Sequence, residues 1–163
     1  WPLYFALFLA LWSAIVGGTF SAFSEFIMSA LKKTAPVGGI EAMQNINRDV
    51  IKTQFVAGIL SIAAFSAIFA VYSLLVFEGE ALVTLVLASL VYLASVFLVT
   101  MFGNVPMNNA LAQFEHDSLD ARVYWEKYTR TWTQLNHARS FGSIVTSGLY
   151  IIAAITLITS GQV

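Results

Sequence analysis

Four apolar segments divide the chain, and each is close to the length that a membrane-spanning helix needs, about 20 residues. They run over about residues 2–31, 55–77, 81–102 and 141–158. The short polar run 78–80 separates the middle pair, so these two segments form a tight antiparallel hairpin. Longer polar connectors, 32–54 and 103–140, join the others. The pattern predicts an all-α fold: an integral membrane four-helix bundle with cytoplasmic helical connectors, in a single domain over residues 1–163.

Composition supports a membrane protein. Of the 163 residues, 58% are hydrophobic and only 10% are charged, whereas about 25% of a soluble domain is charged. The chain has no cysteine, which excludes disulfides and thiolate metal sites. Its net charge of −1 does not favour binding to nucleic acid. The first apolar run is too long for a signal peptide and no basic region precedes it, so we expect a retained span.

All eight basic residues lie in the two long connectors. The positive-inside rule therefore places these connectors in the cytoplasm and both termini outside. We expect an integral protein of the plasma (inner) membrane with membrane lipids as its surroundings. The sequence does not indicate an oligomeric state.

The first span carries small residues at helical spacing, namely Ala14, Gly18 and Ser21, with Glu25 one turn later. Small residues at this spacing let helices pack closely in lipid. We expect Glu25 to continue the same inward face, and an acid inside a membrane bundle is a functional candidate. The alternative is a Glu25 that reaches the interface and pairs with a basic connector residue.

The first connector contains a short amphipathic segment, Ile40–Val50, which we expect to lie along the cytoplasmic membrane surface. Asn47 falls among the apolar residues of its hydrophobic face. It either points into the mouth of the bundle or is a capping or solvated amide.

Asn104, Val105 and Pro106 follow the third span and predict its end, with Asn104 as an N-cap and Pro106 in the first turn of the next helix. Asn108 comes one turn later on the same side and has no capping role. Two amides stacked at the membrane face are suited to hold a polar ligand atom or a buried acid such as Glu25.

A helix is predicted again from about Ala121 and runs unbroken into the fourth span. Its aromatic residues, including Tyr128 and Trp132, are typical either of core packing or of interfacial anchors. Asn136, His137 and Arg139 add polar groups at the membrane boundary. Arg139 has no acid nearby in sequence, so we expect it to pair with Glu25. Before this helix, His116 lies in the most polar stretch and is expected to be exposed.

Three motifs together resemble one family. They are Gly17–Met28 with the following Met43–Asn47, then Asn104–Asn108, and finally Trp132–Arg139 with its Asn-His-Ala-Arg end. In this order, on four spans, they resemble the DUF1772 family of small membrane proteins, which includes the anthrone oxygenase-like proteins. The resemblance covers essentially the whole chain. It implies a four-helix membrane bundle and, for the anthrone oxygenase branch, oxygen insertion into a polycyclic phenol-type substrate, with no organic cofactor established.

The first functional hypothesis is an oxygenase-like enzyme acting on a small, flat, apolar aromatic ligand. His137 or Glu25 would remove the carbon-bound proton, and Arg139 would stabilise the enolate. The amides would add hydrogen bonds and the aromatic side chains would stack on the ligand. This substrate-binding set consists of Asn47, Asn104, Asn108, Tyr128, Trp132 and Asn136.

Two alternatives remain open at this stage. One is a metal or haem site at the same place, with His137 and Glu25 as ligands and His116 as a distant third. With two histidines and no cysteine, the chain offers few ligands for a transition-metal site built from protein side chains alone. The other is a non-enzymatic scaffold or partner subunit, in which Glu25 and Arg139 form a structural pair.

Overall fold

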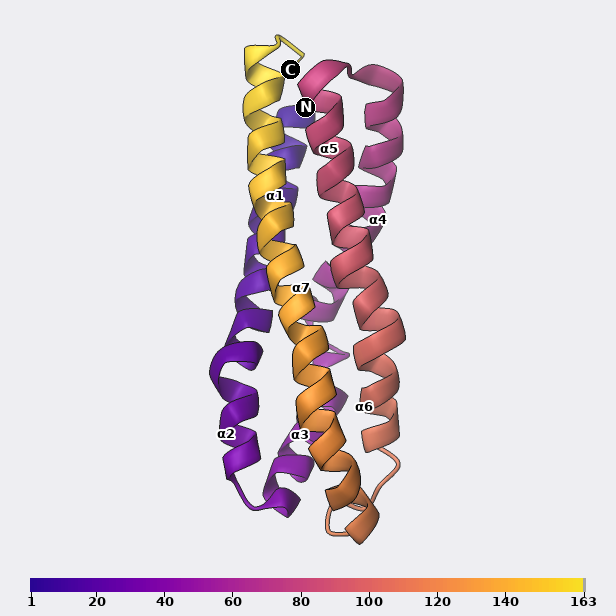
Figure 1. Cartoon of the computed structure of the whole chain (residues 1–163). Helices are drawn as coiled ribbons and strands as arrows, with labels where there is room; N and C mark the ends of the chain where they lie inside the picture. Colours follow the sequence, from indigo (N-terminus) through magenta and orange to yellow (C-terminus); the bar gives the residue numbers. More distant parts are fainter. Residues whose placement is uncertain (163) are drawn as a thin grey trace.

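The computed structural model describes residues 1–162, which form helices and no strand. In chain order the elements are α1 (Pro2–Ala22), the π-helical turn η1 (Phe23–Ile27), α2 (Met28–Lys33), α3 (Pro36–Val50), α4 (Gln54–Val76), α5 (Gly79–Tyr92), the π-helical turns η2 (Leu93–Leu98) and η3 (Thr100–Asn104), α6 (Val105–Leu111) and α7 (Leu119–Thr159). Figure 1 shows both termini at one end of the molecule and the α2–α3 and α6–α7 connections at the other.

Several elements join end to end, so the chain forms four long rods with the shorter α3 beside them (Figure 1). The rods are long and apolar enough to cross a membrane: Pro2–Lys33, Gln54–Val76, Gly79–Leu111 and Leu119–Thr159. The prediction of an all-α membrane bundle is therefore confirmed. α7 has 41 residues and, at about 1.5 Å per residue, is about 60 Å long, twice the roughly 30 Å hydrocarbon thickness. Half of it therefore extends beyond that layer.

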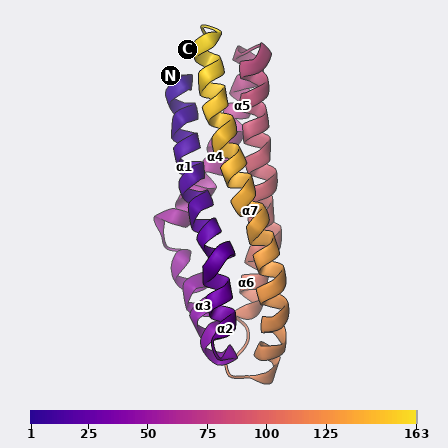
Figure 2. The same cartoon turned by 60° about the vertical axis from the view of Figure 1, so that its left-hand side comes forward.

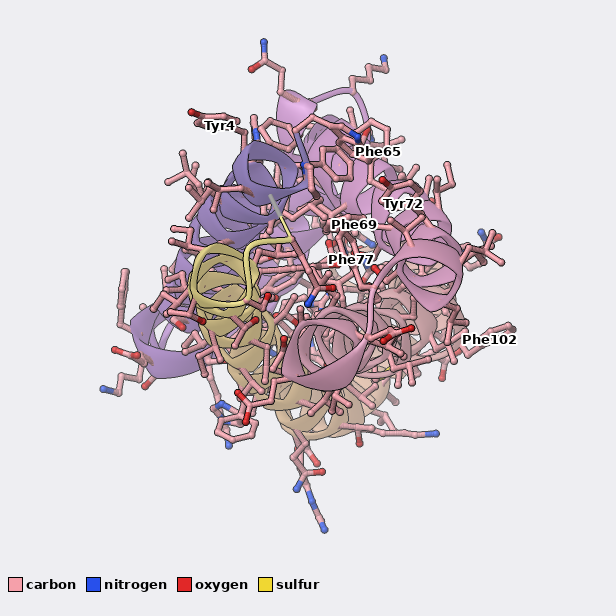
Figure 3. All side chains as sticks on the ribbon, turned by 90° about the horizontal axis from the view of Figure 1, so that it is seen from above. Tyr4, Phe65, Phe69, Tyr72, Phe77 and Phe102 are labelled. Carbon is pink, nitrogen blue, oxygen red and sulfur yellow. The ribbon has the colours of Figure 1, made fainter. Side chains whose placement is uncertain are left out.

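The apolar half of the bundle, near the termini, packs around aromatic side chains. Phe69 and Phe77 are buried between the helices, whereas Tyr4 and Phe102 point away from the bundle (Figure 3). Many large apolar side chains on the outside are exposed, and Leu75 is 80% exposed. Apolar residues on the outer face as well as inside are typical of helices surrounded by lipid.

A second apolar cluster lies at the other end, where α3 covers the extended part of α7. Ile40 and Met43 of α3 are fully buried and pack with Trp125 and Tyr128. The apolar face of this segment, expected to face the membrane surface, packs against the protein itself. α3 instead closes the connector end of the bundle (Figures 1 and 2).

α1 packs side by side with α7 (Figure 2). The face that it presents differs from the predicted one: Ala14 and Gly18 are exposed, while the neighbouring Gly17 is buried. A Cβ atom on Gly17 would lie 3.1 Å from the Cβ of Ser143 on α7. The predicted close approach of small residues therefore exists, but it is one position away, because the large apolar residues around Gly17 select that face for burial.

The third rod does not end at Asn104, which corrects the predicted N-cap. Asn104 has helical backbone angles, φ −70° and ψ −41°, and its side chain makes no capping hydrogen bond. Helix continues through Pro106 to Leu111. Proline removes one backbone donor and crowds the preceding turn. The π-helical turn η3 comes immediately before it and changes the hydrogen-bond register there, which lets the helix pass through proline.

α7 begins where a cap is available and then runs without a break. The Ser118 side chain accepts a hydrogen bond from the backbone N–H of Ala121 at 3.1 Å. The predicted continuity from about Ala121 into the last span is confirmed. One rigid helix therefore carries all the polar groups between Tyr128 and Arg139 in a fixed relation to the apolar span.

Candidate functional site

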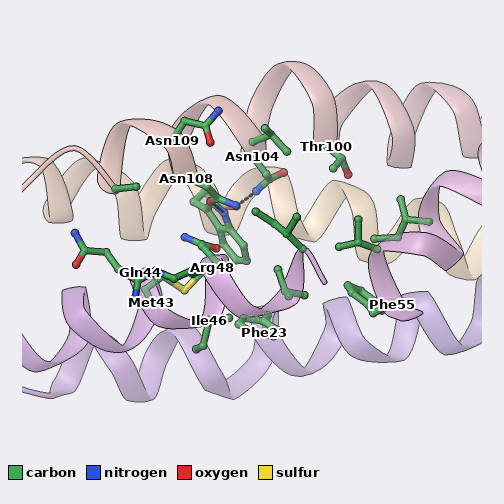
Figure 4. Close-up of a pocket in the computed structure, with 18 of the residues that line it drawn as sticks. Phe23, Met43, Gln44, Ile46, Arg48, Phe55, Thr100, Asn104, Asn108 and Asn109 are labelled. Atoms are coloured by element: carbon green, nitrogen blue, oxygen red, sulfur yellow. Dashed lines mark hydrogen bonds between the residues drawn. The ribbon is translucent and has the colours of Figure 1, made fainter. Parts of the chain in front are cut away.

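A cavity of about 770 Å³ lies at the level where the connector end meets the apolar half. Its walls come from α3 on one side and from η3 and α6 on the other (Figure 4), with α4, α1 and α7 completing them. Five of the residues proposed from the sequence line it: Asn47, Asn104, Asn108, Trp132 and Arg139. The structure thus brings together amides, an indole and a guanidinium from α3, η3, α6 and α7.

Asn108 is the centre of a hydrogen-bonded group on one wall. Its Oδ1 accepts from the Tyr128 hydroxyl at 2.7 Å and from the Trp132 indole N–H at 2.8 Å. Asn47 of α3 donates to the Tyr128 hydroxyl at 3.3 Å. Because both donors meet the oxygen of Asn108, its Nδ2 group is left to donate elsewhere. Tyr128 itself does not line the cavity; it positions the amides that do.

The aromatic residues that hold Asn108 are themselves fixed by stacking along α7. The rings of Trp125 and Tyr128 lie 5.5 Å apart at 13°, and those of Tyr128 and Trp132 lie 6.0 Å apart at 21°. Residues three or four positions apart share a helix face, so this stack follows directly from the sequence spacing. The stack limits the freedom of the indole that lines the cavity.

Arg139 is the buried charged group of the site, and it is only 5% exposed. Its Nη2 donates to Asn136 Oδ1 at 2.7 Å and its Nη1 to Thr100 Oγ1 at 3.4 Å. The guanidinium carbon lies 4.2 Å from the centre of the Phe20 ring and 5.2 Å from that of Trp132. Cation–π contacts of this kind stabilise a desolvated guanidinium by about 2 kcal/mol. No carboxylate of the described residues pairs with it, and its Nε has no partner.

Asn136 connects Arg139 to the first helix. Its Nδ2 donates to the backbone carbonyl of Phe20 and to the Ser24 hydroxyl, both at 2.7 Å. This contact is made where α1 passes into the π-helical turn η1, and such turns are frequent at functional sites. Asn136 does not line the cavity; it orients Arg139.

Asn104 lies beside this group and is fully buried. Its Nδ2 donates to the backbone carbonyl of Trp132 at 3.2 Å, and its Oδ1 has no partner. Asn104 and Thr100 are one helical turn apart, so they share the face of η3 that borders the cavity. An acceptor and a donor without partners, Asn104 Oδ1 and Arg139 Nε, therefore lie around the same cavity.

The structure does not bring Glu25 and His137 into the site. Both are exposed and neither lines the cavity, so the expected pair of Glu25 with Arg139 is not formed. On α7, Asn136 and Arg139 turn inward and His137 lies between them on the other face. On the first rod, the buried face is the one that carries Phe20, which leaves Glu25 outside. The spacing of small residues pointed to the wrong face.

Several cavity residues were not singled out from the sequence. Thr100 is one; it lies four residues before Asn104, and that spacing was an available signal. Gln44 donates to the carbonyls of Leu111 and Phe114, both at 2.9 Å, and so ties α3 to the end of α6. His116, expected to be exposed, is half-buried and lines the cavity at its polar end.

The donor set does not form a protein-only metal centre. Within residues 1–162, no three His, Asp or Glu side chains come together in a way that would hold a metal ion. Glu25 and His137, the ligands considered for a metal site, lie on the exposed surface. The site that the described residues do form is an aromatic cavity with amide groups and one buried guanidinium, that of Arg139.

Comparison with known families gives a match over most of the described helices. A family model described as anthrone oxygenase matches residues 48–149, more than half of the chain. The chain belongs to the anthrone oxygenase family. In this anthrone oxygenase-family protein the match includes the α6 and α7 motifs, with Asn108, Trp132 and Arg139, and leaves α1 outside. No curated protein and no solved structure match the chain.

Proposed function

We propose that this protein oxygenates a flat, phenol-type aromatic compound of the anthrone class, which binds in the cavity and forms its oxyanion next to Arg139. The observation that carries the proposal is the burial of Arg139 without an acidic partner at the wall of an aromatic cavity. A buried charge without a counter-charge is costly. A ligand oxyanion would supply the missing charge and would accept from guanidinium N–H groups that the protein leaves free.

The cavity suits a ligand of this shape. Its volume of about 770 Å³ lies within the usual range for small-molecule sites, about 300–1,000 Å³. Phe20, Phe23, Phe55 and Trp132 line it together with Met43. Aromatic and methionine side chains of this kind offer ring contacts to a planar tricyclic body and adapt to its edges.

The proposed chemistry uses the ligand's own electrons. An anthrone has a carbonyl and, across the ring, a CH₂ group; loss of one CH₂ proton gives an enolate with its negative charge on oxygen. Arg139 stabilises that oxygen, and oriented donors at a developing oxyanion are worth about 10²–10³ in rate. The enolate carbon then transfers an electron pair to O₂ and forms a C–O bond. Loss of the second proton and cleavage of the O–O bond give the quinone carbonyl and water.

The remaining side chains have distinct roles in this proposal. The free Nδ2 of Asn108 donates to a second oxygen of the ligand, since its Oδ1 is already occupied. Asn136 positions Arg139. Glu25 and His137 take no part, because neither lines the cavity. The proton that the ligand loses reaches water at the polar end, where Glu115 and His116 lie.

The test is oxygen consumption by the purified full chain with 1,8-dihydroxyanthrone in detergent or vesicles. Arg139→Met should lower the rate by about 10²-fold or more, while His137→Gln, the matched change at the exposed neighbour, should stay within twofold. Conversion is followed independently by the absorbance of the quinone product. A wild-type chain that does not accelerate oxygen uptake, or an Arg139→Met variant as active as wild type, would overturn the proposal.

A further inference from the structure

We infer that the ligand enters the cavity sideways from the bilayer, through an opening between the first turns of α4 and the π-helical turn η3. The inference rests on the proposed function in one respect, that the ligand is apolar. The opening itself rests on the geometry of the cavity and on the outer surface around it.

Three residues belong both to the cavity wall and to the outer apolar surface. Ile51, Leu60 and Met101 line the cavity and are also 69%, 48% and 40% exposed, respectively. Apolar wall residues exposed to this extent indicate that the cavity reaches the surface there. Leu60 comes from α4 and Met101 from η3, so the opening lies between two different rods.

Packing between the rods supports the same place. α4 packs against α5 and η2, while opposite η3 the cavity lies between the rods, with Ile59 and Leu60 on one side and Thr100 and Met101 on the other. The π-helical turn η3 and the proline after it interrupt the regular helix here. At this level the cavity therefore separates α4 from η3.

The depth of the opening places it among lipid tails. Lys52 lies just before α4, and basic side chains at span ends mark the interface. Leu60 is eight residues further along, so it lies about 12 Å deeper. The opposite end of the cavity is different: Arg48, Glu115 and His116 line it. An apolar ligand would meet charged groups there, whereas the α4–η3 opening presents apolar side chains and the uncharged Thr100.

Physical chemistry favours the lateral route. A neutral anthrone-type compound partitions into the bilayer, because each Å² of apolar surface removed from water is worth about 25 cal/mol. The lateral opening lets the ligand pass from lipid to the aromatic cavity without rehydration. Its charge then develops only next to Arg139, after entry, and the polar end remains a path for water and protons.

The absence of cysteine from the chain allows a reversible block at chosen positions. Leu60→Cys and Met101→Cys can each be modified with a benzyl methanethiosulfonate, which narrows the opening, and restored with dithiothreitol. Leu74→Cys, exposed on α4 and outside the cavity lining, is the matched control. Ala112→Cys, an exposed lining residue at the polar end, blocks the other route.

The probe is 1,8-dihydroxyanthraquinone, a product analogue that does not react. Vesicles loaded with this probe are mixed with vesicles that carry the protein, and the rate at which the tryptophan fluorescence is quenched is measured. Benzylation at Leu60→Cys or Met101→Cys should slow quenching at least tenfold, and reduction should restore it. Leu74→Cys and Ala112→Cys should change it less than twofold. A block at Ala112→Cys with none at the other two positions would overturn the lateral route. No binding to the unmodified protein would overturn the proposed function and this inference with it.

Discussion

Replacement of Asn108 by leucine tests the hydrogen-bonded group at the cavity wall. Leucine branches at Cγ as asparagine does, with methyl groups in place of the amide oxygen and nitrogen, so the change removes polar atoms without opening a void. It removes the acceptor for two donors, the Tyr128 hydroxyl at 2.7 Å and the Trp132 indole N–H at 2.8 Å. Both side chains are buried, at 0% and 5% exposure.

The expected loss follows from these two orphaned donors. Leaving a buried donor without a partner costs about 1–3 kcal/mol. Water in the cavity can reach part of the site and recovers some of this. We therefore expect Asn108→Leu to lower the free energy of unfolding by about 2–4 kcal/mol. Asn108→Asp keeps an acceptor oxygen for both donors, so it should stay within about 1 kcal/mol of wild type. It lacks the free Nδ2 donor and adds a negative charge, so it should still lose binding of the anionic ligand.

Unfolding by SDS in mixed micelles, followed by circular dichroism, measures these differences. Asn109→Leu is the matched control, because Asn109 is the exposed neighbour and lines the same cavity without these bonds. It should be within about 0.5 kcal/mol of wild type. If Asn108→Asp unfolds as easily as Asn108→Leu, the acceptor role assigned to Asn108 is wrong.

Two further predictions concern the helix contacts and the buried charge. Gly142→Ala should destabilise by about 1–3 kcal/mol in the same assay, because a Cβ there overlaps Ser95 of η2. Gly148→Ala, with open space around it, should be neutral or stabilise by up to about 1 kcal/mol. Arg139→Met and Glu25→Gln should have additive effects on stability within about 0.5 kcal/mol, since the two do not pair. Coupling of about 3–5 kcal/mol would instead be the sign of a buried ion pair.

The overall architecture could be predicted from the sequence because lipid imposes a simple rule. Apolar runs of about 20 residues must be helices that satisfy their own backbone groups. The run of residues 78–80 marked a turn between two of them, and a helix does end at Val76 and another begins at Gly79. Length and hydropathy were enough for this level of description.

The rotation of each helix was harder to predict. In a soluble protein the polar face shows which side is outside, but a membrane helix is apolar all round. Gly17 and Gly18 were therefore equivalent in the sequence, and only packing against α7 distinguishes them. The same ambiguity led to the prediction that Glu25 faces inward, whereas it is exposed. Within α7, by contrast, the spacing of Trp132, Asn136 and Arg139 at i, i+4 and i+7 was an available signal that these three share a face without His137.

The π-helical turns were also beyond the sequence argument. An Asn followed two residues later by Pro is typical of a helix start, and Asn104 and Pro106 fit it. The competing solution, an extra residue in one turn, keeps the helix continuous and turns Asn104 toward α7. The stability of this π-helical turn depends on its tertiary contacts, and the local sequence pattern does not show those contacts.

The Phe20 carbonyl and ring, described above as the anchor of Asn136 and Arg139, set a practical limit on shortening the protein. The region matched by the family model starts at residue 48, yet the clamp for its guanidinium comes from the preceding helix. A minimal expression fragment cut at the start of that match would keep the Asn104–Asn108 and Trp132–Arg139 motifs and still release its arginine into the cavity.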